Sequence, residues 1–241
     1  MIDPLLMTAV HVLTYHQNSL LTNASGFFFE RNGRLFLVTS RHVLQDEPSN
    51  HHPDRIEINF HVDRNNVSST TGYSIPLYQN GQCVWRQGID TAGDIDVAVL
   101  EIDRMAMPQT AVYTAFTPAN LPDPEQKIGI GSSMLIVGFP LGFHDTLHHL
   151  PIARHASNAS SYNLRFQGQG YFLTDARTHR GMSGAPVVIK DESANAPGLP
   201  WKLLGIHSAR LDVGTRDVEV DEALGLNCAW YADILMTLTE N

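Results

Sequence analysis

Short apolar runs separated by turn residues are the feature that most limits the fold of this chain of 241 residues. Residues 26–30 and 34–39 are two such runs, and they flank Asn32-Gly33, a pair that favours the type I′ turn of a β-hairpin. Similar runs follow over residues 55–62, 96–102, 133–138, 170–174, 185–189 and 202–207. Because many short strands between turns are typical of sandwiches and barrels, the sequence predicts an all-β fold.

A helical pattern is found near the C-terminus. Trp230, Ile234 and Leu238 recur every fourth residue, so they lie on one face of a helix. We therefore predict a short C-terminal helix within residues 229–238, with this face packed on the body of the protein.

The middle of the chain divides it into two halves. Residues 108–126 have no clear periodicity and contain prolines at positions 118, 122 and 124. We interpret this stretch as a linker between an N-terminal half, residues 1–107, and a C-terminal half, residues 127–241.

The composition disfavours several classes of protein. Hydrophobic residues make up 43% and charged residues 17%, which is typical of a globular protein with a core. The formal net charge is -9 and no cluster of Lys and Arg is evident, so we expect no nucleic-acid partner. No run approaches the roughly 18 apolar residues of a membrane helix, and the N-terminus lacks a signal-peptide pattern. We expect a cytoplasmic protein without a membrane partner, unless a signal peptide has been removed.

Two cysteines, Cys83 and Cys228, leave two alternatives. They form one disulfide bridge, or they are free and buried thiols in a reducing compartment. We favour free thiols, because a small secreted enzyme usually has several bridges. Neither cysteine belongs to a CxxC motif, which disfavours a zinc ribbon or a redox site.

A serine in a glycine-rich turn is the first candidate for catalysis. In Arg180-Gly181-Met182-Ser183-Gly184-Ala185-Pro186, glycines stand close to Ser183 on both sides. A serine hydroxyl attacks a carbonyl only when a base removes its proton, and the resulting oxyanion needs hydrogen-bond donors. Gly181 has no side chain, so its N–H can face a substrate carbonyl together with the N–H of Ser183.

A histidine and an aspartate complete the candidate set. His42 follows the predicted strand 34–39 at a strand-to-turn junction. Asp96 begins the apolar run 96–102, where a carboxylate is costly unless it is paired, and pairing with an imidazole meets that need. Asp94 lies on the same face of this strand. We favour Asp96 because Val-Ala-Val-Leu follows it directly, and we interpret Asp94 as a solvated residue at the strand entry.

The order of these residues separates two kinds of serine hydrolase. The α/β-hydrolase order is Ser, acid, His, and its nucleophile turn ends in a glycine. Here His207 is the only histidine after Ser183, and Ala185 stands at the place of that glycine. The observed order, His42 before Asp96 before Ser183, disfavours the α/β-hydrolase interpretation.

The segments around these candidates have a recognisable pattern. Thr39-Ser40-Arg41-His42 resembles the Thr-Ala-Ala-His motif of the chymotrypsin-fold (trypsin-like) serine peptidases, and Asp96-Val97-Ala98-Val99-Leu100 resembles their Asp-Ile-Ala-Leu-Leu. The segment 181–186 resembles their Gly-Asp-Ser-Gly-Gly-Pro. The resemblance extends from about residue 25 to residue 238. It is closest to the bacterial branch with the high-temperature-requirement proteases and the glutamyl endopeptidases.

This resemblance implies a fold of two antiparallel six-stranded β-barrels with the active site between them. It implies that His42 is the general base, that Asp96 orients it and that Ser183 is the nucleophile. The N–H groups of Gly181 and Ser183 then form the oxyanion hole. The expected function is a serine endopeptidase that acts on proteins or peptides through an acyl-enzyme and needs no cofactor.

The resemblance also suggests residues that bind the substrate. Arg177 stands where the trypsin branch has an Asp that selects a basic residue before the scissile bond (P1), so we expect a basic P1 to be rejected. In glutamyl endopeptidases and picornaviral cysteine proteases, a His and a Thr or Ser at positions similar to His207 and Thr178 bind a P1 Glu or Gln. We therefore predict a P1 preference for Glu or Gln. The alternative is that His207 is a core histidine and Thr178 an ordinary loop residue.

Two further positions belong to this expected substrate site. Ser208 lies in the strand that resembles the substrate-pairing strand of the family. Arg210 stands where the family often has Gly, so its side chain either narrows the pocket or pairs with an acidic P1.

One departure from the family concerns activation. Met182 replaces the Asp that pairs with a newly cut N-terminus in zymogen-activated members. We therefore expect other contacts or a regulatory partner to hold the oxyanion loop. The alternative function is a catalytically silent module of the same fold that binds peptide strands along residues 208–210.

The histidines raise the alternative of a metal site. His144 and His148 are four residues apart, and His51 and His52 are adjacent. A histidine metal site needs a convergent third ligand, and none is evident from the sequence. We therefore expect no metal.

Overall fold

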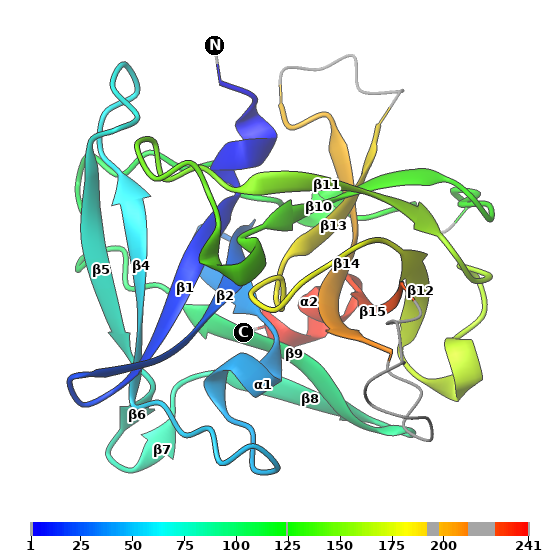
Figure 1. The fold of residues 1–241 in the computed structure, drawn as a ribbon, viewed down its shortest axis with the longest axis horizontal. Helices are drawn as coiled ribbons and strands as arrows, with labels where there is room; N and C mark the ends of the chain where they lie inside the picture. The colour runs from blue at the N-terminus through cyan, green and yellow to red at the C-terminus, as the bar shows by residue number, and fades with distance from the viewer. Residues whose placement is uncertain (1, 124, 192–197, 212–224, 241) are drawn as a thin grey trace.

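The structure is a computed structural model that describes residues 2–123, 125–191, 198–211 and 225–240. It consists mainly of antiparallel strands (Figure 1). The strands of the first half are β1 (Ala9–His16), β2 (Ser19–Arg31), β3 (Arg34–Thr39), β4 (Arg55–His61), β5 (Thr70–Pro76), β6 (Tyr78–Gln79), β7 (Gln82–Cys83), β8 (Arg86–Asp90) and β9 (Gly93–Glu101). Those of the second half are β10 (Ser133–Gly138), β11 (Ile152–Asn158), β12 (Tyr171–Asp175), β13 (Pro186–Lys190), β14 (Trp201–Arg210) and β15 (Leu226–Tyr231).

The helices are short. The α-helices are α1 (Arg41–Leu44) and α2 (Ile234–Leu238). The 3-10 helices are η1 (Pro4–Met7), η2 (Pro118–Asn120), η3 (Pro140–Gly142) and η4 (Phe166–Gly168).

The first half forms a seven-stranded sheet in the order β5-β4-β1-β2-β3-β9-β8. Asn32 and Gly33 connect β2 to β3 with φ values of 53° and 76°. Two successive positive φ values define the type I′ turn, so the predicted hairpin is confirmed.

The second half is a closed barrel in the order β10-β11-β12-β15-β14-β13, and its first and last strands also pair. The side chains that fill it are Ile128, Met134, Ile136, Ala156, Phe172, Ala176, Met182, Ala185, Val187, Leu204 and Ala229. The all-β architecture of two β-rich halves is therefore confirmed.

The first half differs in one respect from the expected six-stranded barrel. Its outer strands β5 and β8 are not paired with each other in the part of the chain that the structure describes. The chain between them forms the separate hairpin β6–β7, and the N–H of Val84 donates to the carbonyl of Leu77 at its base. A hairpin, rather than a continuous ladder, thus links the two edges of the sheet.

Residues 24–29 of β2, 35–39 of β3 and 97–100 of β9 are buried on both faces. In β3, Leu35 and Leu37 point into the core of the first sheet, whereas Phe36 and Val38 point into a second core between the two halves. Trp230 and the other side chains of the second half that pack into this shared core include Val137, Val188, Ile206, Leu235 and Leu238. Burial on both faces explains why these runs are continuously apolar instead of alternating.

The C-terminal helix is shorter than predicted. Residues 226–231 form β15, which pairs with β12 and β14, and the helix begins only at Ile234. The prediction of helix is therefore wrong at residues 229–231, which belong to β15, and at residues 232–233, which form a turn. The ladders on both sides of β15 satisfy its backbone, and this tertiary pairing overrides the helical spacing of the sequence.

Within the predicted linker, residues 108–126, Phe116 lies along β2. The N–H of Phe116 donates to the carbonyl of Phe28, and its carbonyl accepts from the N–H of Glu30. The Phe116 ring packs edge-on against Phe27 in the shared core. The stretch between the halves is thus anchored to the body of the protein.

Both cysteines are free, as favoured from the sequence, but only Cys228 is buried, whereas Cys83 is exposed. Their separation follows from their elements, because Cys83 ends the outer hairpin strand β7 and Cys228 lies within the barrel strand β15. Within the described part of the chain, none of the helices has the length and apolar character needed to span a membrane.

Candidate active site

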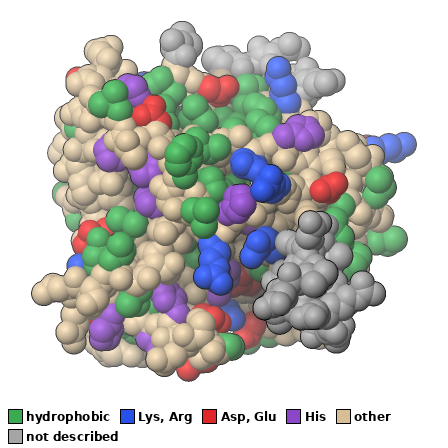
Figure 2. All heavy atoms as spheres, viewed as in Figure 1, with side chains coloured by type: hydrophobic (Ala, Val, Ile, Leu, Met, Phe, Trp, Pro, Cys, Tyr) green, Lys and Arg blue, Asp and Glu red, His purple; other side chains and the backbone are tan. Residues whose placement is uncertain are grey.

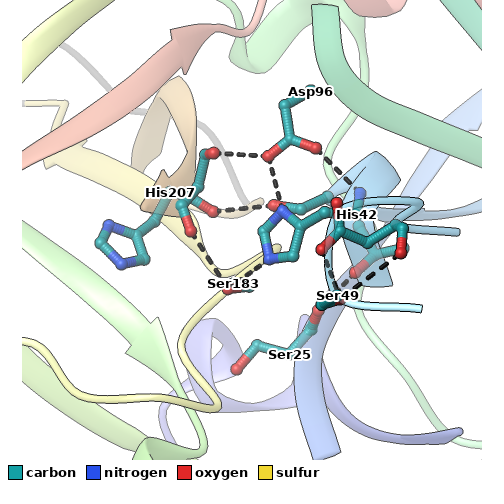
Figure 3. Close-up of polar contacts among 10 residues, drawn as sticks. Ser25, His42, Ser49, Asp96, Ser183 and His207 are labelled. Carbon is teal, nitrogen blue, oxygen red and sulfur yellow. Dashed lines mark hydrogen bonds and ion pairs between the residues drawn. The ribbon is translucent and has the colours of Figure 1, made fainter. Parts of the chain in front are cut away.

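Three segments bring His42, Asp96 and Ser183 together between the two halves (Figure 3). His42 lies in α1, Asp96 lies in β9, and Ser183 lies in the turn between β12 and β13. The Nε2 atom of His42 is 2.9 Å from the Ser183 hydroxyl oxygen, and its Nδ1 atom is 2.7 Å from Oδ2 of Asp96. In this arrangement the imidazole can take the serine proton while the carboxylate holds the other ring nitrogen.

The single turn of α1 is fixed from two sides. Val43 and Leu44 are buried in the core of the first sheet. The other carboxylate oxygen of Asp96 accepts the backbone N–H of His42 at 2.9 Å. One carboxylate therefore positions both the backbone and the ring of this histidine.

The environment of Asp96 favours its ionised form. Burial alone would raise its pKa, but hydrogen bonds and charge from His42, together with the hydroxyl of Ser208 at 2.5 Å, hold the pKa below the ordinary value. For His42, burial would lower the pKa, and the hydrogen bond and charge of Asp96 outweigh it, so the pKa is raised. The pair thus stabilises an imidazolium when one forms.

Two glycines in the turn around Ser183 adopt left-handed backbone conformations. The φ value is 91° at Gly181 and 85° at Gly184. A Cβ atom on Gly184 would lie 2.2 Å from the carbonyl oxygen of Ser25, and one on Gly181 would lie 2.4 Å from that of Phe139. Both positions therefore need glycine for conformation and for space.

Ser25 in β2 joins this turn to the first half of the molecule. Its N–H donates to the carbonyl of Ser183 at 2.9 Å, and its hydroxyl donates to the carbonyl of Gly181 at 2.7 Å. The same hydroxyl accepts the N–H of Phe139 at 3.0 Å. Met182 itself is buried in the barrel core. Contacts from Ser25 thus hold the loop in which the family's Asp is missing.

The candidate oxyanion donors have a defined orientation. The carbonyl of Arg180 accepts the N–H of Leu141 at 2.6 Å. In a trans peptide the carbonyl and the following N–H point in opposite directions, so the Gly181 N–H points away from Leu141. Among the residues described, neither this N–H nor that of Ser183 has an acceptor. Both donors are therefore available to a ligand.

A family model described as the trypsin-like peptidase domain matches residues 24–195. This chain belongs to that family. The matched residues include His42, Asp96 and Ser183. A comparison of the sequence with curated proteins finds no significant match.

The fold of this trypsin-like peptidase is similar to that of a bacterial enzyme. The crystal structure of the serine endoprotease from Yersinia pestis matches with a TM-score of 0.56 and 17% sequence identity. The match covers 96% of this chain and 61% of that chain, so this chain spans less than two thirds of the length of the bacterial enzyme. At this identity, the likeness concerns the fold.

The residues predicted to bind substrate in this trypsin-like peptidase occupy different environments. Thr178 and His207 are both buried, and the Thr178 hydroxyl donates to Oδ1 of Asn227 at 2.5 Å. The ring of His207 points away from His42 (Figure 3). Arg177 and Arg210 are exposed.

Ser208 lies in strand β14 and joins the hydrogen-bond network of Asp96, His42 and Ser183. Its hydroxyl donates to Asp96, and its carbonyl accepts the Ser183 hydroxyl at 3.1 Å. The carbonyl of the preceding residue, His207, accepts the hydroxyl of Ser40 and the N–H of Gly184. His207 and Ser208 are therefore held by hydrogen bonds to residues of both halves.

The structure separates the two candidate acids. Asp94 is exposed and pairs through the β-ladder with Ile89, whereas Asp96 reaches His42. The side chains of His144 and His148 do not converge on a third ligand, and the described residues include no group of three or more His, Cys, Asp or Glu arranged to hold a metal.

Sequence reasoning missed two polar residues of this site, Ser25 and Asn227. Both are almost completely buried. The available signal was a single polar residue at the edge of an apolar run, as in Ser25-Gly26-Phe27-Phe28 and Asn227-Cys228-Ala229-Trp230. Such a residue needs a hydrogen-bond partner when it is buried, but the sequence does not identify the partner.

Proposed function

We propose that this trypsin-like peptidase is a serine endopeptidase with Ser183 as nucleophile, His42 as general base and Asp96 as the orienting acid. The observation that carries the proposal is the continuous chain of hydrogen bonds from the Ser183 hydroxyl through both ring nitrogens of His42 to Asp96. The N–H groups of Gly181 and Ser183, which have no acceptor among the described residues, support the same proposal as an oxyanion hole.

The reaction follows from these positions. His42 Nε2 takes the hydroxyl proton while the Ser183 oxygen attacks the peptide carbonyl. The oxyanion of the tetrahedral intermediate accepts the two N–H groups, and Asp96 stabilises the imidazolium. His42 then gives its proton to the leaving amine, and a water molecule activated by the same base hydrolyses the acyl-enzyme.

The proposal includes a preference for Glu or Gln at P1 over Arg or Lys. Burial and the charge of His42 lower the pKa of His207 to about 4, so at neutral pH its ring is uncharged and donates one N–H. Arg177 directly precedes Thr178 in the sequence, and Arg210 is three residues after His207. Both arginine side chains are exposed. A positive charge on these two side chains disfavours a basic P1 residue beside them. Figure 2 shows Lys and Arg side chains gathered near the middle of the face viewed.

Labelling with a fluorophosphonate probe tests the nucleophile. We expect the wild-type protein to be labelled at Ser183, and both Ser183→Ala and His42→Ala to remain unlabelled while they keep the native circular dichroism spectrum. A folded wild-type protein without labelling would favour the alternative, a silent module that binds peptide strands.

A peptide library tests the P1 preference. We expect cleavage after Glu or Gln, and loss of that cleavage in His207→Ala while the small probe still labels Ser183. Cleavage after Arg or Lys, or an unchanged profile in His207→Ala, would contradict this part of the proposal.

Two expectations from the sequence accompany the proposal. We propose a cytoplasmic location and regulation by narrow specificity or by a partner protein. Localisation of a tagged full chain by microscopy and fractionation tests the first, and recovery of partners by cross-linking to Ser183→Ala tests the second.

A further inference from the structure

Asn227 is a buried carboxamide whose orientation is fixed by its neighbours. Its Nδ2 group donates to the carbonyls of Ala176 at 2.8 Å, Gly225 at 3.2 Å and Thr174 at 3.3 Å. Because all three partners are acceptors, they require the nitrogen on this side of the amide. The oxygen of Asn227 therefore faces Thr178.

This orientation decides the role of the Thr178 hydroxyl. Oδ1 of Asn227 can only accept, so the hydroxyl must donate its one proton to it, over 2.5 Å. Turning that proton toward a ligand would leave a buried acceptor unpaired, which is costly. With its proton used in this way, the Thr178 hydroxyl can only accept a hydrogen bond from a ligand.

His207 lies on the same face of the barrel as Asn227. In the β14–β15 ladder His207 is directly opposite Ala229, and Asn227 is two residues before Ala229. Paired residues of an antiparallel ladder share a face, as do residues two apart on one strand. The ring is buried, and its Nδ1 atom has no partner among the described residues. A neutral imidazole has one N–H to donate.

We infer that Asn227 is a positioning residue that makes the P1 site select glutamine over glutamate. The inference rests on the proposed function and deepens it. His207 supplies one donor, and Thr178, held by Asn227, supplies one acceptor.

The side chain of glutamine matches this pair. Its carbonyl accepts the N–H of His207, and its NH₂ group donates to the Thr178 oxygen. A glutamate carboxylate has acceptors only, so it faces the lone pairs of Thr178 and brings an unpaired charge beside a neutral histidine. A site built for one donor and one acceptor therefore rejects glutamate.

Peptides that differ only at P1 test the inference on the unmodified protein. We expect kcat/KM for Gln to exceed that for Glu by at least about tenfold near pH 8. N,N-dimethylglutamine keeps the carbonyl but has no N–H, so we expect it to be cleaved at least about tenfold more slowly than Gln.

Variants test the role of the two buried residues. Thr178→Val removes the acceptor and should lower kcat/KM for Gln about tenfold or more with little change for Glu, whereas Thr178→Ser should keep the preference. Asn227→Leu frees the Thr178 proton and should lower the Gln-to-Glu ratio. If Asn227→Leu fails to fold, the comparison of Thr178→Val with Thr178→Ser and the dimethylglutamine peptide still test the inference.

The possible failures are distinguishable. If Ser183 is labelled by a fluorophosphonate but Glu is cleaved as well as Gln, or dimethylglutamine as well as Gln, the inference is wrong and the proposed function stands. If the folded protein is neither labelled nor able to cleave any peptide, both are wrong.

Discussion

Asp96 accepts hydrogen bonds from the His42 backbone, the His42 ring and the Ser208 hydroxyl. A carboxylate held by three donors stays ionised and keeps the proton of His42 on Nδ1, which leaves Nε2 free to act as a base. At the scale of single residues, this carboxylate decides the tautomer on which the proposed chemistry depends.

Replacing this carboxylate by an amide tests its role. We expect Asp96→Asn to lower kcat by about three to four orders of magnitude, because the amide can hold the wrong tautomer. The matched substitution Asp94→Asn should change kcat less than about twofold, since Asp94 is exposed and away from His42. Steady-state kinetics on one peptide measures both. A severe Asp94→Asn and a mild Asp96→Asn would show that the acid is assigned to the wrong residue.

Ser25 contacts the backbone of the turn around Ser183 and does not contact the Ser183 hydroxyl. Ser25→Ala removes the hydroxyl that holds the carbonyl of Gly181, but it keeps the backbone bond to Ser183. We expect kcat to fall about 10- to 100-fold with little change in KM, because a loosened oxyanion loop mainly affects the transition state. Ser19→Ala, on an exposed part of the same strand, is the control. An unchanged kcat in Ser25→Ala would show that other contacts suffice.

At the scale of elements, the sequence predicts the strands that are buried on both faces or begin at a clear turn. The run 133–138 matches β10, and 34–39 matches β3, residue for residue. The strands that it misses, such as β11 with the sequence Ile-Ala-Arg-His-Ala-Ser-Asn, expose polar side chains on one face and lack a continuous apolar run. Their register depends on neighbouring strands, and a local pattern does not contain that information.

The site shows the same division between local and distant signals. His42, Asp96 and Ser183 each stand in a local motif, so the sequence suggests all three. The contact between Ser25 and Gly181 joins residues 156 positions apart, and that between Thr178 and Asn227 joins residues 49 positions apart. Only the folded chain brings these pairs together, and they are the contacts that orient the predicted groups.

The core of the first sheet gives a prediction at this scale. Leu37 in β3 is fully buried, whereas Leu20 in β2 is 56% exposed. We expect Leu37→Ala to lower the free energy of unfolding by about 2–5 kcal/mol, because it removes buried methyl groups and leaves a cavity. Leu20→Ala should change it by less than about 0.5 kcal/mol. Urea denaturation followed by fluorescence measures both, and similar values would contradict the assigned core.

At the scale of the whole molecule, histidines gather where the face of the first sheet that is turned toward the second half meets the loop after η3. His11 in β1 stacks on Phe139 with a ring-centroid distance of 4.8 Å and lies 5.2 Å from the ring of His144. These rings line a cavity of about 280 Å³ together with His149. Burial, and then the charge of His144, lower the pKa of His11 to about 4.

This pKa makes stability depend on pH. The unfolded chain takes up a proton at His11 near pH 6.5, and the folded protein does so only near pH 4. The stabilisation is therefore complete above pH 6.5 and is lost as the pH falls from about 6.5 to about 4, by on the order of 3 kcal/mol.

Paired denaturation curves at neutral and acidic pH check this dependence. We expect His11→Gln to lose less stability on acidification than the wild-type protein, because glutamine takes up no proton. His16→Gln, on an exposed position of the same strand, should behave like the wild type. An equal loss in His11→Gln and the wild type would contradict a role for His11.

The core shared by the two halves also limits how the halves can move relative to each other. This core contains Phe27, Phe36 and Val99 from the first half and Ile206 and Trp230 from the second. A hinge-like opening would expose these apolar side chains to water, which is unfavourable. We therefore expect the halves to unfold in one cooperative step, and neither to form a stable protein when expressed alone. The distance between the two halves around His42, Asp96 and Ser183 is then nearly constant. Loop movements, and not a separation of the halves, are then the motions that can change the geometry around Ser183.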